Sequence, residues 1–188
     1  MDLPHISFDT AIVGLQHHEG WLCVGNESRV VLVHEKHNPH DENAVAVYPT
    51  SRYNSEIVMD DKRVGYIPRA IAAVLCRYIP EDISDHVARE AHENSVKCSI
   101  TARVIGDHRE NKDKVTREKR IHIPITISIT CADAEVHKTV QDGVVRVLAQ
   151  EKQRKIDDDF RRSARKAFGY HHTDEELDKL IANSMGAK

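Results

Sequence analysis

The sequence is poor in the features that mark small secreted proteins and membrane proteins. Its 188 residues include only four cysteines, scattered without a Cys-x-x-Cys pair, at Cys23, Cys76, Cys98 and Cys131. Their apolar or strand-like surroundings predict buried, reduced thiols. The N-terminus has no basic region followed by an apolar stretch, and a run of about 18 apolar residues is absent throughout. We therefore expect a soluble intracellular protein without a membrane partner, nuclear in a eukaryote and cytoplasmic otherwise.

The sequence also lacks an excess of positive charge. It has 27 Lys and Arg against 30 Asp and Glu, and its formal net charge is −3 when histidine is neutral. Sequence-independent binding to phosphates needs a clear basic excess, so any nucleic-acid site must be local. Histidine, in contrast, is abundant at 13 residues, and mild acidification could reverse the sign of the net charge.

Aromatic residues are scarce, at 5% of the chain, so each one outside the core carries information. Hydrophobic residues make up 40% and charged residues 30%, which is a globular rather than a disordered composition. A chain of this length fits one ordinary domain plus an appendage, and it can bury a core without disulfide or metal staples.

The first 131 residues show the hydrophobic pattern of an antiparallel β domain. The alternation predicts strands over residues 6–15, 21–24, 29–34, 44–48 and 63–67, and a hairpin of 96–105 with 120–131 around a charged, mobile tip. The polar segment 49–62 is expected to be a loop. Pro68 is expected to open a helix that stops at Pro80 and caps one end of the sheet, and 85–91 shows a weak helical pattern.

From Asp133 the hydrophobic period changes from two to about 3.6, which predicts an amphipathic helical appendage. Gly169 is a plausible stop for it, and Thr173 with Glu176 forms a capping-box signature for a last helix through Ile181. The pattern predicts an α+β protein: an antiparallel β meander or barrel with a short capping helix over residues 1–133, then a helical C-terminal extension over 134–188.

Three separated motifs resemble the HIRAN domain family. They are the Val13-Gly14-Leu15 strand end with its polar turn, the segment Asn38-Pro39-His40-Asp41-Glu42-Asn43-Ala44-Val45-Ala46-Val47, and Val64-Gly65-Tyr66-Ile67-Pro68-Arg69 before a helix. The middle pattern, N-P-x-D-x-N-A-x-x-V, is the most specific of the three. The hairpin that ends at Cys131 resembles the closing strands of the family, so the resemblance covers residues 8 to about 131.

The resemblance implies an OB-like barrel that holds the 3′ end of single-stranded DNA, with a role in DNA repair or replication-fork processing. Asp41 would accept a hydrogen bond from the terminal hydroxyl, and its charge would disfavour a terminal phosphate. Arg69, at a helix start, would reach a phosphate, and Tyr66 would either donate to a phosphate or stack on a base. The expected nucleic-acid-binding residues are Gln16, His17, His18, Asn38, His40, Asp41, Tyr66 and Arg69.

The sequence departs from the family where bases are expected to stack. The turn that reads Arg-Tyr-Tyr in a relative that binds DNA ends is Gln16-His17-His18 here, and the loop tyrosine is His40. Histidine still stacks on bases, but its ring is smaller and is mostly uncharged near pH 7. We therefore expect weaker and more pH-dependent binding, or a different ligand such as RNA.

Several alternatives remain open from the residues alone. Asn38, Pro39, Asp41 and Asn43 could simply build the turn through Asx hydrogen bonds. The basic run 146–166 could be an auxiliary nucleic-acid contact or a solvated helix face, and its apolar stripe could mediate a homodimer, which would make the protein an interaction module. We predict no metal site at His34, His37 and His40, because a strand end would point these rings apart. We expect no cofactor and no catalysis, since no catalytic signature occurs.

Overall fold

The computed structural model describes residues 3–18, 20–53, 56–59, 62–81, 98–107, 109–112, 119–168 and 173–186. The chain divides into two compact units, residues 1–144 and 145–188, and the boundary falls inside helix α3 (Ala134–Phe168). Within the described ranges, no helix is long and apolar enough to cross a membrane.

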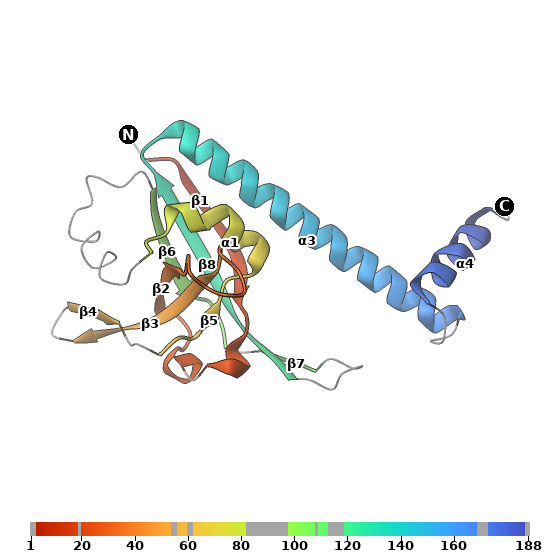
Figure 1. Ribbon diagram of the computed structural model, residues 1–188, viewed down its shortest axis with the longest axis horizontal. Coiled ribbons are helices and arrows are strands. Elements are labelled where there is room, and N and C mark those ends of the chain that lie inside the picture. Colours follow the sequence, from red (N-terminus) through yellow and green to blue (C-terminus); the bar gives the residue numbers. More distant parts are fainter. Residues whose placement is uncertain are drawn as a thin grey trace. The chain divides into compact units, whose positions relative to one another are not determined.

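The first unit is built on a curled antiparallel sheet (Figure 1). Its strands are β1 (His5–Ile12), β2 (Arg29–His34), β3 (Val45–Tyr53), β4 (Glu56–Met59), β5 (Gly65–Tyr66), β6 (Cys98–Val104), β7 (Arg109–Lys112) and β8 (Lys119–Cys131). Six of them follow the order β1-β8-β6-β2-β3-β4, while β5 pairs with β3 and β7 with β8. Paired 2.9 Å backbone hydrogen bonds between Val13 and Tyr66 bring the end of β1 to β5. The predicted antiparallel β architecture is confirmed.

The core lies on the concave side of this sheet and follows from strict alternation. In β8, Ile123, Ile125, Ile127 and Ile129 are buried, and Phe8 pairs in register with Ile127. Successive side chains of a strand point to opposite faces, so these isoleucines share one face. Helix α1 (Arg69–Leu75) covers this core with its buried Ile71, Ala72 and Leu75.

Strands β2 and β3 are buried on both faces, which explains the unbroken apolar run of β2. Leu32 pairs with the fully buried Val47, while Val33 pairs with Ala46 on the opposite face. That outer face carries a small apolar cluster of Val31, Val33, Ala46 and Tyr48, and Tyr66 packs against it. A sheet with both faces covered needs such a continuous hydrophobic strand.

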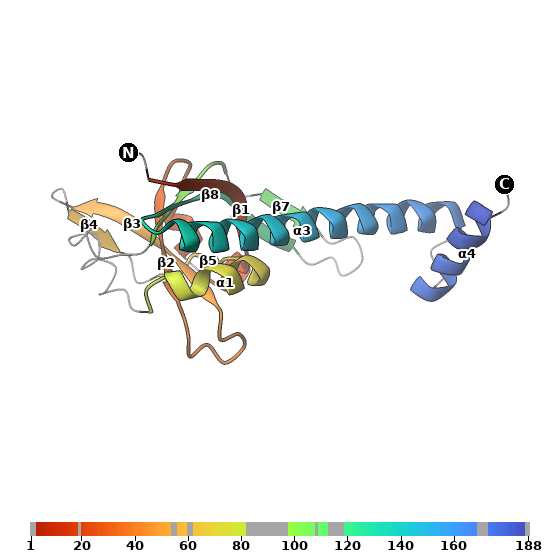
Figure 2. The same cartoon turned by 90° about the horizontal axis from the view of Figure 1, so that it is seen from above.

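The first turns of α3 belong to the first unit. Asp133 caps the helix, because its Oδ1 accepts the backbone N–H of Glu135 at 2.8 Å. Val140 and Val144 are buried, and Gly143 lies against Val74 at the end of α1. Figures 1 and 2 show these turns beside α1.

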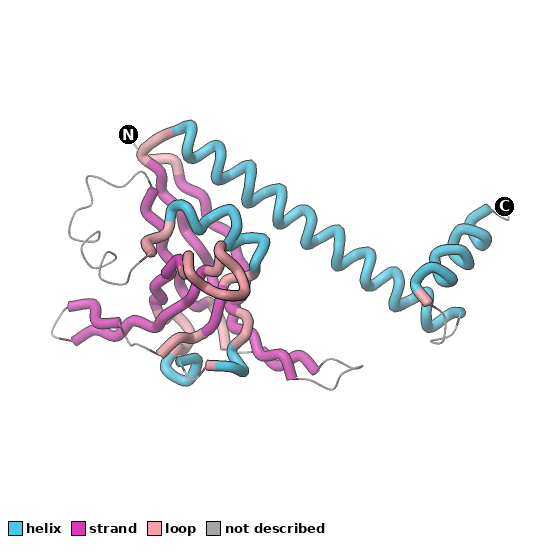
Figure 3. Tube along the Cα trace, in the orientation of Figure 1, coloured by secondary structure: helices cyan, strands magenta, loops and turns pink. Residues whose placement is uncertain are grey.

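The described residues of the second unit lie almost wholly in helices, and the strands described above belong to the first unit (Figure 3). It comprises the rest of α3 and helix α4 (Asp174–Gly186), with Ala164 and Leu177 buried. The predicted capping box is confirmed: Thr173 N–H donates to Glu176 Oε2 at 2.8 Å, and Glu176 N–H donates to Thr173 Oγ1 at 3.3 Å. The helix stop expected at Gly169 and the helical pattern at 85–91 lie outside the described residues.

Three predictions of local structure are wrong. Residues 21–24 are not a strand, because a 3-10 helix, Gly20–Cys23, forms there and is fixed by a 3.1 Å bond from Gly20 N–H to the Arg63 carbonyl. The expected loop 49–62 contains the β3–β4 hairpin, and part of the expected irregular tip forms β7. Antiparallel backbone pairing satisfies the peptide groups in these segments even where the hydrophobic pattern is weak.

The prediction of four buried, reduced cysteines is wrong in part: Cys98 and Cys131 are buried as predicted, but they are not reduced. Cys98 and Cys131 form a disulfide, because they lie directly opposite one another in the β6–β8 register with 4.2 Å between their Cα atoms. Cys23 is free and exposed, and only Cys76 matches the expectation of a buried free thiol. A spacing of 33 residues gives no sign of this pairing until the strand register is known.

Candidate nucleic-acid interface

The candidate site lies on the outer face of β2, β3 and β5, at the end of β2. Tyr66 on β5 sits directly opposite Ala46, which places its ring on the outer apolar cluster. Glu35 is the first residue after β2, and its backbone N–H donates to the Ala44 carbonyl at 2.8 Å. The strand register therefore brings Glu35 and Tyr66 together, although 31 residues separate them.

Two glycines shape the backbone around Tyr66. Gly14 has φ of 77°, a left-handed conformation that other residues rarely adopt, and it starts the 3-10 helix Leu15–His17. A Cβ on Gly65 would lie 2.5 Å from the Val13 carbonyl oxygen, so only glycine permits this approach of β5 to the end of β1.

The motif loop between β2 and β3 is fixed by Asx hydrogen bonds. Asn38 Oδ1 accepts the backbone N–H of His40 at 3.0 Å, and Asp41 Oδ1 accepts that of Asn43 at 3.0 Å. The Ala44 N–H also donates to the Asp41 carbonyl at 3.0 Å. This is the turn chemistry proposed from the sequence, and it holds the loop in one conformation.

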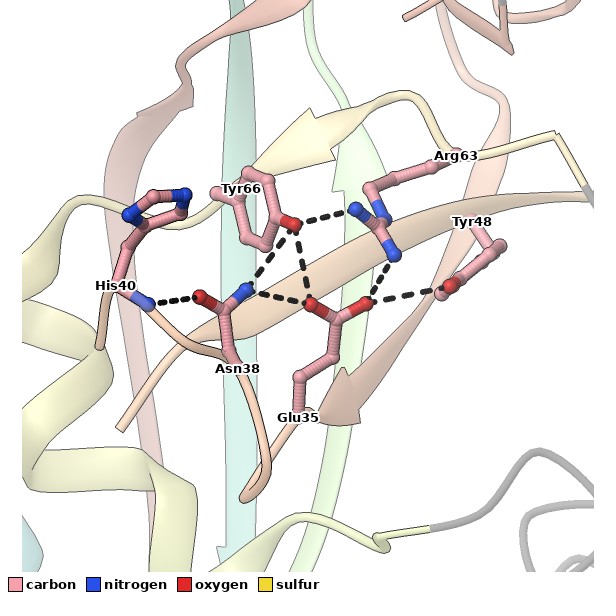
Figure 4. Close-up of polar contacts among 6 residues, drawn as sticks. All are labelled: Glu35, Asn38, His40, Tyr48, Arg63 and Tyr66. Carbon is pink, nitrogen blue, oxygen red and sulfur yellow. Dashed lines mark hydrogen bonds and ion pairs between the residues drawn. The ribbon is translucent and has the colours of Figure 1, made fainter. Parts of the chain in front are cut away.

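Beneath the loop, five side chains form what we call the Glu35 network (Figure 4): Glu35, Asn38, Tyr48, Arg63 and Tyr66. Glu35 Oε1 accepts hydrogen bonds from Arg63 and, at 3.5 Å, from the Tyr48 hydroxyl. Glu35 Oε2 accepts from Asn38 Nδ2 at 2.9 Å and from the Tyr66 hydroxyl at 3.0 Å. The Glu35 carboxylate is the centre that connects the loop to β3 and β5.

Tyr66 is held from several sides. Its hydroxyl accepts hydrogen bonds from Arg63 and, at 3.3 Å, from Asn38 Nδ2. The Arg63 guanidinium carbon lies 5.0 Å from the ring centroid, and the His18 ring meets Tyr66 edge-on with centroids 5.6 Å apart. An aromatic side chain fixed in this way is a ready stacking surface.

The proximity of these groups changes their proton affinities. Burial, followed by the charge and the hydrogen bond of Glu35, raises the pKa of Tyr66. Burial acts to lower the pKa of Arg63, but its contacts with Tyr48 and Glu35 outweigh burial and raise it. Burial, then the nearby charges of Arg63 and His17, lowers the pKa of His18. Near neutral pH the network therefore holds an ionised Arg63 and a neutral Tyr66.

The network borders a pocket of about 490 Å³. The lining residues are His34, Glu35, Lys36, His37, Asn38, Pro39, His40, Arg63, Tyr66 and Glu81. Lys36 and Glu81 form a 3.3 Å ion pair, with their side chains 57% and 56% exposed. The two cations of the lining are thus matched by two carboxylates.

The predicted site residues fall into three groups. Asn38, His40 and Tyr66 line the pocket, and His18 contacts Tyr66. Gln16 and His17 bond to each other at 3.2 Å in an exposed 3-10 helix and are not among the lining residues. Asp41 and Arg69 form a separate 3.2 Å ion pair outside the lining, in which Arg69 is 80% exposed and Asp41 16%.

Seven lining residues were not predicted as binding residues from the sequence: His34, Glu35, Lys36, His37, Pro39, Arg63 and Glu81. Glu35 directly follows the strongest predicted strand, and Arg63 directly precedes the Val64-Gly65-Tyr66 motif. A charged residue at each of these strand ends could have suggested a site. Only the β3–β5 register, however, shows that the two side chains meet.

Residues 5–130 match the family model described as the HIRAN domain, a range that contains every residue lining the pocket. Among solved structures, the chain is similar to the HIRAN domain of human HLTF, with 19% identity and a TM-score of 0.41 over 75% of this chain and 88% of that one. It is also similar to a protein from Lactobacillus plantarum, with 12% identity and a TM-score of 0.34 over 66% of this chain and 96% of that one. No curated protein matches the chain.

Proposed function

The chain belongs to the HIRAN domain family, which is generally associated with DNA binding, and we propose that it binds single-stranded DNA at the 3′ end. The observation that carries this proposal is the fixed Tyr66 ring, which lies beside the Arg63 guanidinium in the wall of the pocket. Proteins commonly bind single strands with an aromatic face and a neighbouring cation. A base stacks on the ring, and a phosphate pairs with the cation. The proposal is a binding function, in DNA repair or replication-fork processing, without catalysis.

The size of the pocket suits one terminal nucleotide. Pockets for small ligands typically measure about 300–1,000 Å³, and this one measures about 490 Å³. His40 and His18 lie beside Tyr66 and supply further rings against which a base can pack. Stacking is worth about 1–3 kcal/mol per base and does not depend on base identity, so little sequence preference is expected.

Asp41 and Arg69 supply the proposed means of recognising the end. Asp41 Oδ1 accepts the Asn43 N–H, and Asp41 Oδ2 pairs with Arg69. A carboxylate accepts about four hydrogen bonds in all, so both oxygens have capacity left. Asp41 can therefore still accept a terminal hydroxyl, while the exposed guanidinium of Arg69 has donors left for a phosphate. A phosphate in place of that hydroxyl would meet the negative charge of Asp41.

The test is a titration of the full chain into fluorescent single strands that end in a 3′ hydroxyl or a 3′ phosphate. We expect tighter binding to the hydroxyl end, and loss of that preference in Asp41→Ala. Equal affinity for both ends, or an unchanged preference in Asp41→Ala, would contradict recognition of the 3′ end. A matching oligoribonucleotide shows whether RNA replaces DNA.

A second candidate function is self-association through the second unit. Val145, Ile156 and Phe160 on α3 are 59%, 52% and 54% exposed. Their spacing of eleven and four residues places them on one helix face. Light scattering should then show a dimer that Ile156→Glu with Phe160→Glu converts to a monomer. A monomeric wild-type chain would exclude this candidate.

A further inference from the structure

Glu35 is a half-buried acid in a pocket proposed to bind an anion, and that placement requires a reason. Its side chain is 18% exposed, and both oxygens are saturated: Arg63 and Tyr48 donate to one, and Asn38 and Tyr66 to the other. A buried carboxylate with so many donors is held in one rotamer and holds each of its donors in turn.

This arrangement determines what Tyr66 can offer a ligand. Its hydroxyl donates its one proton to Glu35 and accepts from Arg63 and Asn38, which uses both lone pairs. The hydroxyl has no hydrogen-bonding capacity left for a phosphate or a base edge. Tyr66 therefore contributes its ring, and the orientation of that ring is set at the hydroxyl.

The same carboxylate positions Arg63. Of the five N–H groups that an arginine guanidinium carries, one donates to Glu35 and one to Tyr66. Its side chain remains 31% exposed and lines the pocket. The backbone of Arg63 is fixed as well, since its carbonyl accepts the Gly20 N–H.

We propose, on the premise of the nucleic-acid function above, that Glu35 is the positioning residue of the pocket: its carboxylate holds the Tyr66 ring and the Arg63 guanidinium in the orientation that receives the terminal nucleotide. Glu35 itself does not contact the ligand. It acts by removing the cost of ordering these two groups when the strand binds.

The proposal predicts a change in affinity opposite to the one that simple electrostatics predicts for the loss of the Glu35 charge. Removing a negative charge from a phosphate-binding pocket should strengthen binding by reducing repulsion. If Glu35 positions the pocket, its removal weakens binding instead. Glu81 is the matched control, because it lines the same pocket and pairs only with Lys36 among the contacts described, outside the Glu35 network.

The experiment compares Glu35→Gln and Glu81→Gln in the full chain, with the labelled 3′-hydroxyl strand as the probe. Glutamine has the shape of Glu35 but replaces one acceptor oxygen with an NH₂ group, which must face existing donors. We expect Kd to rise about tenfold in Glu35→Gln, equivalent to about 1.4 kcal/mol, and to stay level or fall in Glu81→Gln. Equal or tighter binding by Glu35→Gln would overturn the proposal. A wild-type chain that binds no strand would overturn the proposed function, and the proposal with it.

Two further measurements separate positioning from a general loss of structure. Tyr66→Phe keeps the ring and removes the hydroxyl, so in the Glu35→Gln background it should add little to the loss of affinity; additive losses would contradict the coupling. Carbon NMR of labelled tyrosine, assigned with Tyr66→Phe, should show a lower pKa for Tyr66 in Glu35→Gln and none of this change in Glu81→Gln. An unchanged pKa of Tyr66 would overturn the proposal, and the comparison is made at pH values where the tyrosine spectrum of Glu35→Gln keeps the dispersion of the folded wild type.

Discussion

Two ion pairs border the same pocket and are built in opposite ways. Glu35 and Arg63 are mostly buried, and each has further partners in the Glu35 network. Lys36 and Glu81 are mostly exposed and share one 3.3 Å contact. Water and salt screen exposed charges, whereas a mostly buried pair with several further hydrogen bonds fixes geometry. The Glu35–Arg63 pair therefore determines the shape of the site, whereas the Lys36–Glu81 pair adjusts only its charge.

The largest expected difference between the two pairs is in stability. Arg63→Met leaves the half-buried Glu35 carboxylate without its cation, and we expect the free energy of unfolding to fall by about 2 kcal/mol. Lys36→Met should change it by less than about 0.5 kcal/mol, because its partner remains solvated. Urea denaturation of both variants provides the measurement. Equal losses would remove the distinction between the pairs.

The next effect concerns the ring that the Glu35 network holds. Tyr66→Ala removes the stacking surface, and we expect the affinity for single-stranded DNA to fall by about 1–2 kcal/mol, or roughly five- to thirtyfold. Fluorescence anisotropy at fixed salt measures this loss. Tyr66→Phe should lose less, since its ring remains. An unaffected Tyr66→Ala would place the DNA elsewhere on the protein.

A smaller effect is a dependence of stability on pH through His18. Burial, Arg63 and His17 lower the pKa of His18 from 6.5 in the folded state, so the unfolded chain binds more protons between the two values. Stability therefore falls as the pH drops below about 6.5. Thermal unfolding should show a smaller acid-induced loss in His18→Gln than in the wild type. An identical pH profile in the two proteins would contradict this assignment.

The smallest effect belongs to the exposed pair. In Glu81→Gln, Lys36 is released toward the ligand, and we expect binding about twofold tighter at low salt and unchanged at high salt, where exposed charges are screened. A salt series of the oligonucleotide titration checks this. A large effect that persists at high salt would show that the exposed pair also fixes geometry.

The sequence predicted those parts of the fold that depend on local patterns. The alternating isoleucines of β8 and the capping box of Thr173 and Glu176 are confirmed, because strand periodicity and helix capping act over a few residues. The β3–β4 hairpin and the Cys98–Cys131 disulfide were missed, because both depend on which strand pairs with which.

The same limit applies to the candidate site. Asn38, His40 and Tyr66 were predicted from motifs, and the structure places all three in the pocket lining. Glu35 and Arg63 were missed because their 28-residue separation becomes a contact only through the outer face of β3. A hydrogen-bonded network assembled from several strands has no signature in any one segment of sequence.

The most direct test of the proposed function is an NMR titration of the full chain with a short 3′-hydroxyl single strand. The account predicts that chemical shift changes concentrate at His40, Arg63, Tyr66 and their neighbours in the pocket, and that they weaken when the strand ends in a phosphate. Changes confined to α3 and α4, or none at strand concentrations that saturate binding, would contradict a nucleic-acid pocket on the outer face of the sheet.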